Sequence, residues 1–256
     1  MATTPQNNLS DAHTERPALA GRRIAITGGT TGIGRAIAVL LASEGARVFV
    51  CGRDEAHLAD ALARIREVGQ GDGVSVDLSR REDVPKFFDA AEAGLGGLDA
   101  VVINQAVPAV GLDDAPEPDI AYQTATNFTA YLLAAKAASE RLGEGADIVF
   151  IGSMSAVSRE PGSSVYVAAK TGIEGFAQAL RKELAERNIK VGLVEPGLAG
   201  SDLQYPDIPA DKQREMIHQE TMLRAEDIAV SVQFMLTQPR RATISLVRIE
   251  PRVEAQ

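Results

Sequence analysis

Tyr166 and Lys170 lie four residues apart in the segment SSVYVAAK, and Ser153 ends the strand-like run DIVFIGS upstream of them. Four residues make about one helical turn, so a helix over 164–187 would place the phenol and the ammonium on one face. A neighbouring positive charge favours phenolate and lowers the pKa of tyrosine from about 10. The spacing predicts that Tyr166 is a general acid/base whose pKa is lowered by Lys170.

Ser153 adds a hydrogen-bond donor to this pair. Hydride that reaches a carbonyl carbon leaves negative charge on the oxygen, which a donor must stabilise and an acid must protonate. Ser153 can supply the hydrogen bond and Tyr166 the proton, and one such donor typically lowers the barrier by about 3 to 4 kcal/mol. The three residues together indicate interconversion of a carbonyl and an alcohol.

A glycine-rich turn, TGGTTGIG at 27–34, lies between the first strand-like run and a helix that starts near Ile33. Glycines let the backbone approach a pyrophosphate closely, and the helix N-terminus directs free N–H groups at it. This context predicts a dinucleotide site. Its expected contacts in the turn are Gly28, Thr30, Thr31, Gly32, Ile33 and Gly34.

The end of the second strand bears on the choice of cofactor. In many dinucleotide-binding folds an acidic residue about twenty residues after the glycines holds the ribose 2′-hydroxyl. Here the strand ends in Cys51-Gly52, Arg53 follows, and Asp54 is expected to cap the next helix. A missing carboxylate beside an arginine favours a 2′-phosphate, so NADP is predicted, with NAD still possible and a solvated Arg53 as the alternative.

The elements that must position these residues form a regular alternation. Short β-branched runs are separated by longer helical patterns, and the runs are RRIAIT, ARVFVC, GVSV, DAVVIN, DIVFIG, KVGLV and ISLVRI. Such alternation is typical of a parallel sheet with helices on both faces. We expect an α/β single-domain Rossmann fold with a doubly wound, seven-stranded parallel sheet over 20–256. A flexible extension at 1–19 and a short substrate lid at 202–224 complete the expected organisation.

The composition of the chain limits the kinds of partner that the protein is expected to bind. The 256-residue chain has a net charge of -9, which argues against nucleic acid or an anionic membrane surface as its main partner. The lone Cys51 and the lack of a long apolar run predict a cytoplasmic location. The three histidines are scattered, so no metal site is expected. Alanine-rich faces in the helical patterns at 119–143 and 164–187 predict a homodimer or homotetramer.

These motifs occur together in an order that resembles the short-chain dehydrogenase/reductase family. The resemblance runs from about residue 21 to the C-terminus and is carried by TGGTTGIG, by the spacing of Ser153, Tyr166 and Lys170, by Asn127 in TATNFTAY and by Pro196-Gly197 in VEPGLAGSDL.

The resemblance implies a role for each matching residue. Tyr166 corresponds to the catalytic acid/base, Ser153 to the hydroxyl that hydrogen-bonds the reacting oxygen, and Lys170 to the residue that also binds the nicotinamide ribose. Asn127 matches the asparagine that organises a proton-relay water. The further implied cofactor contacts are Asp77 at the adenine with Leu78 beside it, Asn104, Ala106, Pro196, Gly197, Ala199 at the carboxamide and Ser201 at the phosphates.

The substrate contacts are predicted by position only, and they are Val107, Ser153, Met154, Ser155, Glu160, Tyr166 and Tyr205. Where the family commonly has NNAG, this chain has Asn104-Gln105-Ala106-Val107, so the branched Val107 is expected to narrow or reshape the pocket. Thr31 stands where NADP-preferring relatives often carry a basic residue. The C-terminal segment is similar to that of a branch which includes reductases and dehydrogenases of small 3-hydroxy acids.

The expected function is therefore hydride transfer between NADP(H) and a carbonyl or alcohol of a small ketone, aldehyde or 3-hydroxy/3-oxo acid. A non-catalytic dinucleotide sensor or scaffold with the same fold is the alternative from another class. A pure binder gains little from retaining Ser153, Tyr166 and Lys170, which counts against it. Enoyl reduction generally uses a wider tyrosine-to-lysine spacing, and nucleotide-sugar epimerases add a substrate domain.

Overall fold

The structure is a computed structural model that describes residues 16–108, 111–204 and 207–253. In these ranges seven parallel strands form one sheet in the order β3-β2-β1-β4-β5-β6-β7. The strands are β1 (Arg23–Ile26), β2 (Arg47–Gly52), β3 (Gln70–Ser75), β4 (Ala100–Ile103), β5 (Asp147–Ile151), β6 (Lys190–Pro196) and β7 (Leu246–Ile249). The predicted seven-stranded, Rossmann-type parallel sheet is confirmed.

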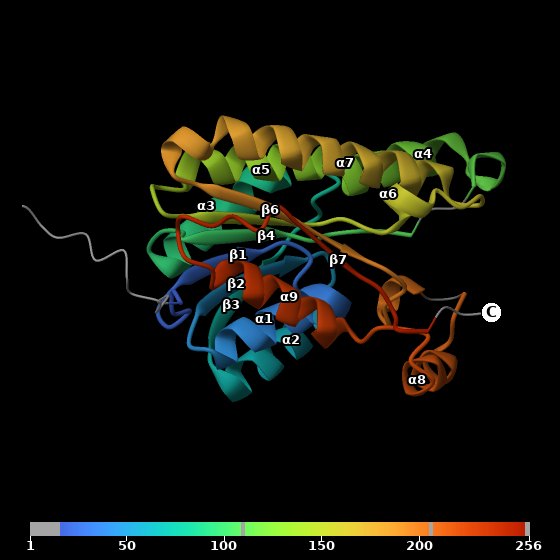
Figure 1. Cartoon of the computed structure of the whole chain (residues 1–256), viewed down its shortest axis with the longest axis horizontal. Helices are drawn as coiled ribbons and strands as arrows, with labels where there is room; N and C mark the ends of the chain where they lie inside the picture. The colour runs from blue at the N-terminus through green and yellow to red at the C-terminus, as the bar shows by residue number, and fades with distance from the viewer. Residues whose placement is uncertain (1–15, 109–110, 205–206, 254–256) are drawn as a thin grey trace, which may run out of the picture.

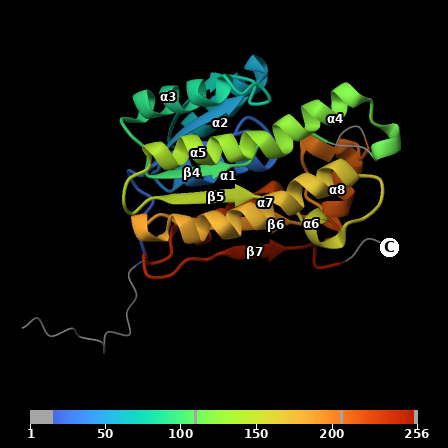
Figure 2. The same ribbon diagram turned by 90° about the horizontal axis from the view of Figure 1, so that it is seen from above.

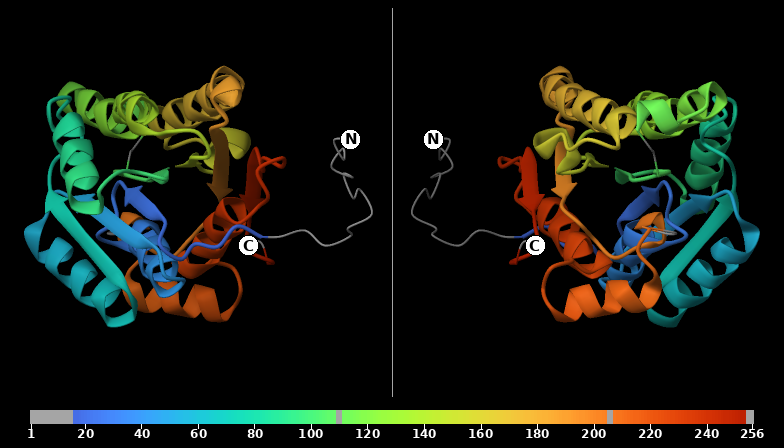
Figure 3. Two further views of the ribbon diagram at one scale, coloured as in Figure 1. Left: turned by 90° about the vertical axis from the view of Figure 1, so that its left-hand side faces the viewer. Right: turned by 90° about the vertical axis from the view of Figure 1, so that its right-hand side faces the viewer.

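Helices cover both faces of the sheet (Figure 1). One face carries α3 (Asp83–Leu95), α4 (Glu117–Thr124), α5 (Ala130–Arg141), α6 (Ser155–Ser158) and α7 (Ser164–Glu183), and the other carries α1 (Gly32–Ser43), α2 (Glu55–Val68) and α9 (Ala225–Leu236). Seen end-on, the green and gold helices α5 and α7 lie opposite the blue α1 and the red α9 (Figure 3). The remaining segments are α8 (Ala210–His218), the 3-10 turns η1 (Leu112–Asp114), η3 (Ala185–Arg187) and η4 (Asp202–Gln204), and the π-helical η2 (Ala125–Thr129).

Successive residues of each strand enter opposite cores, because side chains alternate across a sheet. In β5, Ile148 and Phe150 pack with α5 and α7, whereas Val149 and Ile151 pack on the side of α1 and α9. The central strands are therefore apolar on both faces, as a parallel sheet between two helix layers requires.

The strands all point toward one edge of the sheet, where α4, α6 and α8 gather (Figure 2). In the register of the sheet, Ile24 of β1 pairs with Val48 of β2 on one side and with Ala100 of β4 on the other. The chain reverses its direction of winding between β1 and β4, and ligands bind at such a switch point in open α/β sheets. The sheet thus brings the loops after its strands to one common site.

The helices begin largely where the sequence indicates. Asp54 caps α2 as predicted, and its Oδ1 accepts a hydrogen bond of 2.8 Å from the backbone N–H of His57. The helical pattern at 119–143 is not one α-helix, because the π-helical η2 joins α4 to α5. Among the described residues, no helix is both long and apolar enough to cross a membrane.

Candidate active site

A cleft of about 750 Å³ opens at the carboxyl edge of the sheet. This volume lies within the range of about 300 to 1,000 Å³ that is usual for small-ligand and cofactor sites. Given the strand order, residues after β2 and β3 line one end and residues after β5 and β6 the other. The predicted site residues that line it are Gly28, Thr30, Thr31, Gly32, Ile33, Arg53, Asp77, Leu78, Asn104, Ala106, Val107, Ser153, Met154, Ser155, Tyr166, Lys170, Pro196, Gly197, Ala199 and Ser201.

The glycine-rich turn lines the cleft at the start of α1. Gly28 and Gly32 have positive φ angles of 60° and 48°. A Cβ on Gly34 would lie 2.0 Å from the carbonyl oxygen of Gly28, so this position supports the turn from behind and does not line the cleft. No side chain caps the N-terminus of α1. Its free N–H groups and positive dipole end suit the pyrophosphate of a dinucleotide.

One end of the cleft carries Arg53 in place of a carboxylate. A Cβ on Gly52 would lie 2.3 Å from Oγ1 of Thr30, so no acidic side chain fits at the end of β2. The guanidinium of Arg53 donates a hydrogen bond to the hydroxyl of Tyr122 in α4, and it lies 5.8 Å from the centre of that ring. Asp77 is also at this end, and its Oδ1 accepts a hydrogen bond of 3.0 Å from the N–H of Ser79. The guanidinium of Arg53 thus lines this end of the cleft together with the carboxylates of Asp54 and Asp77.

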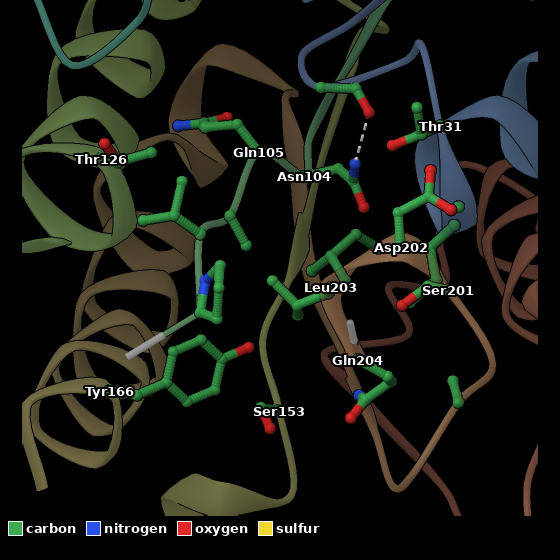
Figure 4. Close-up of a pocket in the computed structure, with 18 of the residues that line it drawn as sticks. Thr31, Asn104, Gln105, Thr126, Ser153, Tyr166, Ser201, Asp202, Leu203 and Gln204 are labelled. Carbon is green, nitrogen blue, oxygen red and sulfur yellow. Dashed lines mark hydrogen bonds between the residues drawn. The ribbon is translucent and has the colours of Figure 1, made fainter. Parts of the chain in front are cut away.

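Asn104 joins the glycine turn to β4. Its Nδ2 donates to the carbonyl oxygens of Gly28 at 2.9 Å and Thr27 at 3.3 Å, and its backbone N–H donates to Oγ1 of Thr27 at 2.9 Å. Figure 4 shows the side chain of Asn104 with one of its hydrogen bonds as a dashed line. Thr27 in turn donates to Oε1 of Gln105, whose Nε2 is buried without a hydrogen-bond partner. The side chain of Asn104 therefore holds the backbone of the glycine-rich turn in place, and Asn104 also lines the cleft.

Asn127 has a structural task that its predicted role does not include. Its Oδ1 accepts from the N–H of Val107 at 2.8 Å, and its Nδ2 donates to the carbonyl of Val107 at 2.9 Å. The side chain is 1% exposed and does not line the cleft, because both of its polar ends are used by that backbone. Asn127 therefore fixes the position of the Val107 side chain, which does line the cleft.

The hydroxyl groups of Ser153 and Tyr166 project into the same part of the cleft (Figure 4). Ser153 follows β5, and its Oγ donates to Oγ of Ser155 at 3.0 Å and accepts from the N–H of Ser155 at 3.1 Å. Burial raises the pKa of Tyr166 to about 12, and the nearby hydroxyl of Ser153 acts in the opposite direction by a smaller amount. The phenol is therefore protonated at neutral pH.

Nζ of Lys170 lies 5.4 Å from the centre of the Tyr166 ring, but it donates its hydrogen bonds to other groups. Its Nζ donates to the hydroxyl of Tyr131 and to the carbonyl oxygen of Ile151, each at 3.0 Å. Burial lowers the pKa of Lys170 to about 7. The prediction that Lys170 lowers the pKa of Tyr166 is therefore wrong for this structure, because desolvation dominates at both groups.

Comparison with known proteins agrees with this geometry. A family model described as short chain dehydrogenase matches residues 22–211. The chain belongs to the short-chain dehydrogenase/reductase family. Members of this family use nicotinamide dinucleotides, and the protein is an oxidoreductase of that family.

Individual relatives cover most of the chain. The chain is 33% identical over 219 residues to carbonyl reductase family member 4 from Xenopus laevis, across 84% of this chain and 91% of that protein. It is 33% identical over 220 residues to a human 3-oxoacyl-[acyl-carrier-protein] reductase, with the same two shares covered. A short-chain dehydrogenase from Burkholderia cenocepacia, solved in complex with NADP, has 30% identity and a TM-score of 0.82 over 92% of this chain and 98% of that chain.

Two predicted substrate contacts of this family member are not placed at the cleft. Glu160 is exposed and does not line it, because the chain turns outward after α6, where Arg159 takes a left-handed φ of 56°. Tyr205 lies outside the described residues. Within the expected lid at 202–224, α8 is tied to the loop before it by Gln213, whose Nε2 donates to the carbonyl of Ser201 at 3.2 Å and whose Oε1 accepts from its N–H at 2.9 Å.

Other residues of the site were not predicted. The cleft is also lined by Gln105, Tyr122, Thr126, Ile151, Asp202, Leu203 and Gln204. Tyr131 lies behind the cleft and holds Lys170. The sequence gives one indication that Tyr131 belongs to the site, which is its position four residues after Asn127. That spacing places the two residues on one helical face.

Proposed function

We propose that the protein is an NADPH-dependent reductase that converts the carbonyl group of a small ketone, aldehyde or 3-oxo acid to an alcohol. The observation that supports this most directly is that the Ser153 and Tyr166 side chains line the same cleft (Figure 4), with Nζ of Lys170 5.4 Å from the centre of the Tyr166 ring. Bound NADPH would supply the hydride. The residues of the chain would orient the carbonyl, stabilise its charge and deliver the proton.

Each hydroxyl has a separate task in this proposal. As the carbonyl carbon is reduced, negative charge grows on its oxygen, and Ser153 donates a hydrogen bond to that charge. Tyr166 then gives its phenolic proton to the oxygen. A tyrosine with a pKa of about 12 holds its proton at neutral pH, which favours the direction of reduction. The reverse reaction needs the phenolate, which burial makes costly.

The preference for NADPH is supported by the end of the cleft that carries Arg53. An arginine can bind a 2′-phosphate through charge-assisted hydrogen bonds, and the crowding at Gly52 excludes the carboxylate that would hold a 2′-hydroxyl. Tyr122 holds the guanidinium at the cleft wall. The NADP-bound relative from Burkholderia cenocepacia supports the same choice.

The class of substrate is supported by the relatives and by the shape near Tyr166. The Xenopus relative is named a carbonyl reductase and the human one a 3-oxoacyl reductase. In this chain the side chain of Val107 lines the cleft and is fixed by Asn127, so it narrows the space available beside the reacting carbonyl. A compact carbonyl compound suits that space.

The proposal is tested by following NADPH absorbance with the purified protein and a panel of ketones, aldehydes and 3-oxo acids. Tyr166→Phe should lower kcat by about 10² to 10⁴, the usual contribution of a positioned proton donor. Ser153→Ala should lower it by about 10² to 10³. Ser163→Ala is the matched control, because this serine lines the cleft without a hydrogen bond from its hydroxyl. A Tyr166→Phe protein as active as the wild type would contradict the proposal.

We also propose that the protein forms a homodimer or homotetramer. The prediction was based on alanine-rich faces at 119–143 and 164–187, but in α5 the alanines Ala134 and Ala138 are buried in the chain's own core and give no support. Val230 and Phe234 support it instead, because they lie one turn apart on α9 with 55% and 48% of their surface exposed. Light scattering should show a dimer or tetramer for the wild type, and Phe234→Glu should shift the protein toward the monomer. A wild-type protein that is monomeric at micromolar concentration would exclude the proposed oligomer.

A further inference from the structure

We propose that Tyr131 is a positioning residue that holds the ammonium of Lys170 at the floor of the cleft and stabilises its charge. The inference rests on the proposed function for its kinetic consequence, while its effect on Lys170 itself can be measured without any reaction. Tyr131 does not line the cleft, so it acts through Lys170 and not on a substrate.

The contacts of Lys170 leave one donor for the cleft. An ammonium carries three N–H donors. Two of them go to the hydroxyl of Tyr131 and the carbonyl of Ile151, each at 3.0 Å. Lys170 also lines the cleft, so its third donor is the one available to whatever the cleft binds. Tyr131 and Ile151 together fix the direction of that donor.

The groups that stabilise the charged form of Lys170 are all neutral. The side chain is 1% exposed, and no carboxylate of the described residues forms an ion pair with it. The titratable groups that face it are Tyr131 from α5 and Tyr166 from α7, while β5 contributes the carbonyl of Ile151. Its Nζ lies 4.7 Å from the ring centre of Tyr131 and 5.4 Å from that of Tyr166. The hydroxyl of Tyr131 is the nearer group at 3.0 Å, so Tyr131 acts on the ammonium as a hydrogen-bond acceptor.

A purely structural role would not require the Tyr131 hydroxyl. That hydroxyl donates to the carbonyl of Ile151 at 3.0 Å, but the carbonyl already accepts from Lys170. If the Tyr131 hydroxyl is removed, the carbonyl of Ile151 still accepts a hydrogen bond from Lys170. The ring of Tyr131 stacks on Phe150 at a centroid distance of 6.3 Å, and a phenylalanine would keep this contact. Tyr131→Phe should therefore fold, and it removes one acceptor from Lys170.

The first test measures Lys170 directly by NMR titration of lysine labelled at the ζ-nitrogen, with a Lys170→Met sample for assignment. A hydrogen bond to a charged group changes a protonation equilibrium by about tenfold, so the titration of Lys170 in Tyr131→Phe should move about one pH unit lower. Phe150→Leu is the matched control, because it loosens packing around the same ring and keeps the hydroxyl. It should leave the titration of Lys170 in place.

The second test measures the pH dependence of carbonyl reduction. In Tyr131→Phe the fall in kcat at alkaline pH should begin about one unit lower than in the wild type, with the rate recovered at acid pH. A structural defect would instead lower the rate by the same factor at every pH. The inference would be overturned if Tyr131→Phe kept both the Lys170 titration and the pH profile of the wild type. It would also be overturned if Phe150→Leu shifted them by as much as Tyr131→Phe does. If no carbonyl is reduced but the titration moves, the proposed function fails and the role of Tyr131 stands.

Discussion

Lys170 follows Tyr166 by one helical turn, and its ammonium lies 5.4 Å from the centre of the Tyr166 ring while its hydrogen bonds go to Tyr131 and Ile151. The two titratable groups are therefore neighbours whose pKa values shift in opposite directions, up for the phenol and down for the ammonium. Both shifts come from burial, which disfavours charge on either group. The site thus favours a proton on Tyr166 near neutral pH.

Reduction and oxidation should differ in their pH dependence. Oxidation of an alcohol needs the phenolate of Tyr166, so its rate should rise by up to about tenfold per pH unit across the assay range, which lies below the pKa of about 12. Reduction uses the phenol, and in our proposal the ammonium of Lys170 also directs its third donor into the cleft, so the rate of reduction should fall above the lysine pKa of about 7. The measurement is kcat/KM in both directions between pH 6 and 10. Parallel profiles in the two directions would contradict this reading of Tyr166.

Lys170→Met should stabilise the fold at acid pH. Below pH 7 the lysine is protonated in the folded and unfolded states alike, so the folded state carries the full cost of burying the charge. Between the folded pKa of about 7 and the ordinary lysine pKa of 10.5 the unfolded chain binds more protons, so the stability of the wild type rises with pH.

The gain from Lys170→Met should therefore be largest below pH 7, on the order of a few kcal/mol, and small near pH 10. Urea unfolding at pH 6 and at pH 9.5 measures it. Lys136→Met, at an exposed lysine paired with Glu140, is the control and should show no such pH dependence. A gain at Lys170 that does not change with pH would mean that its charge is not the cause.

Arg53→Asp should move cofactor preference toward NADH. The loss of a charge-assisted hydrogen bond to the 2′-phosphate should lower kcat/KM for NADPH by about 10 to 100-fold and leave NADH nearly unchanged. The binding of each cofactor, measured by fluorescence, should follow the same pattern. Arg64→Asp is the control, since this exposed arginine of α2 pairs with Asp60 and does not line the cleft. If the ratio of kcat/KM for NADPH to that for NADH were unchanged in Arg53→Asp, Arg53 would have no part in cofactor selection.

The sequence predicts those features that depend on local geometry. One helical turn is enough to relate Tyr166 to Lys170, and a glycine-rich turn between a strand and a helix is enough to place the dinucleotide site. Asp54 is a further case, because a short acidic side chain before a helical pattern indicates a cap wherever it occurs. The strands follow from β-branched runs buried on both faces.

Features that depend on contacts between distant segments could not be predicted. The partner of Lys170 is Tyr131, which lies 39 positions earlier in another helix, so no local pattern joins them. The strand expected at GVSV is present, but β3 begins three residues earlier, at Gln70, in the segment QGDG, which has the composition of a loop. Gly71 is required there because a Cβ would lie 2.5 Å from a methyl group of Ile65. The strand is held by pairing with β2, and that pairing uses backbone groups that leave no mark in the sequence.

Gly34→Ala should damage the dinucleotide site more than its small added volume suggests. The new Cβ would lie 2.0 Å from the carbonyl oxygen of Gly28 and 2.5 Å from Nδ2 of Asn104, and backbone cannot yield there without moving the turn. We expect NADPH affinity to fall more than about tenfold and stability to fall by about 1 to 3 kcal/mol, as overpacking usually costs. Gly175→Ala in α7 is the matched control, because nothing lies within 4 Å of its Cβ position.

That control should raise stability by up to about 1 kcal/mol, since alanine favours a helix more than glycine does. Fluorescence titration with NADPH and thermal unfolding measure both effects on the same samples. If Gly34→Ala bound NADPH as tightly as the wild type, the turn would have to shift freely while holding the cofactor. That freedom is incompatible with a site whose glycines keep the backbone of the turn close to both Asn104 and the start of α1.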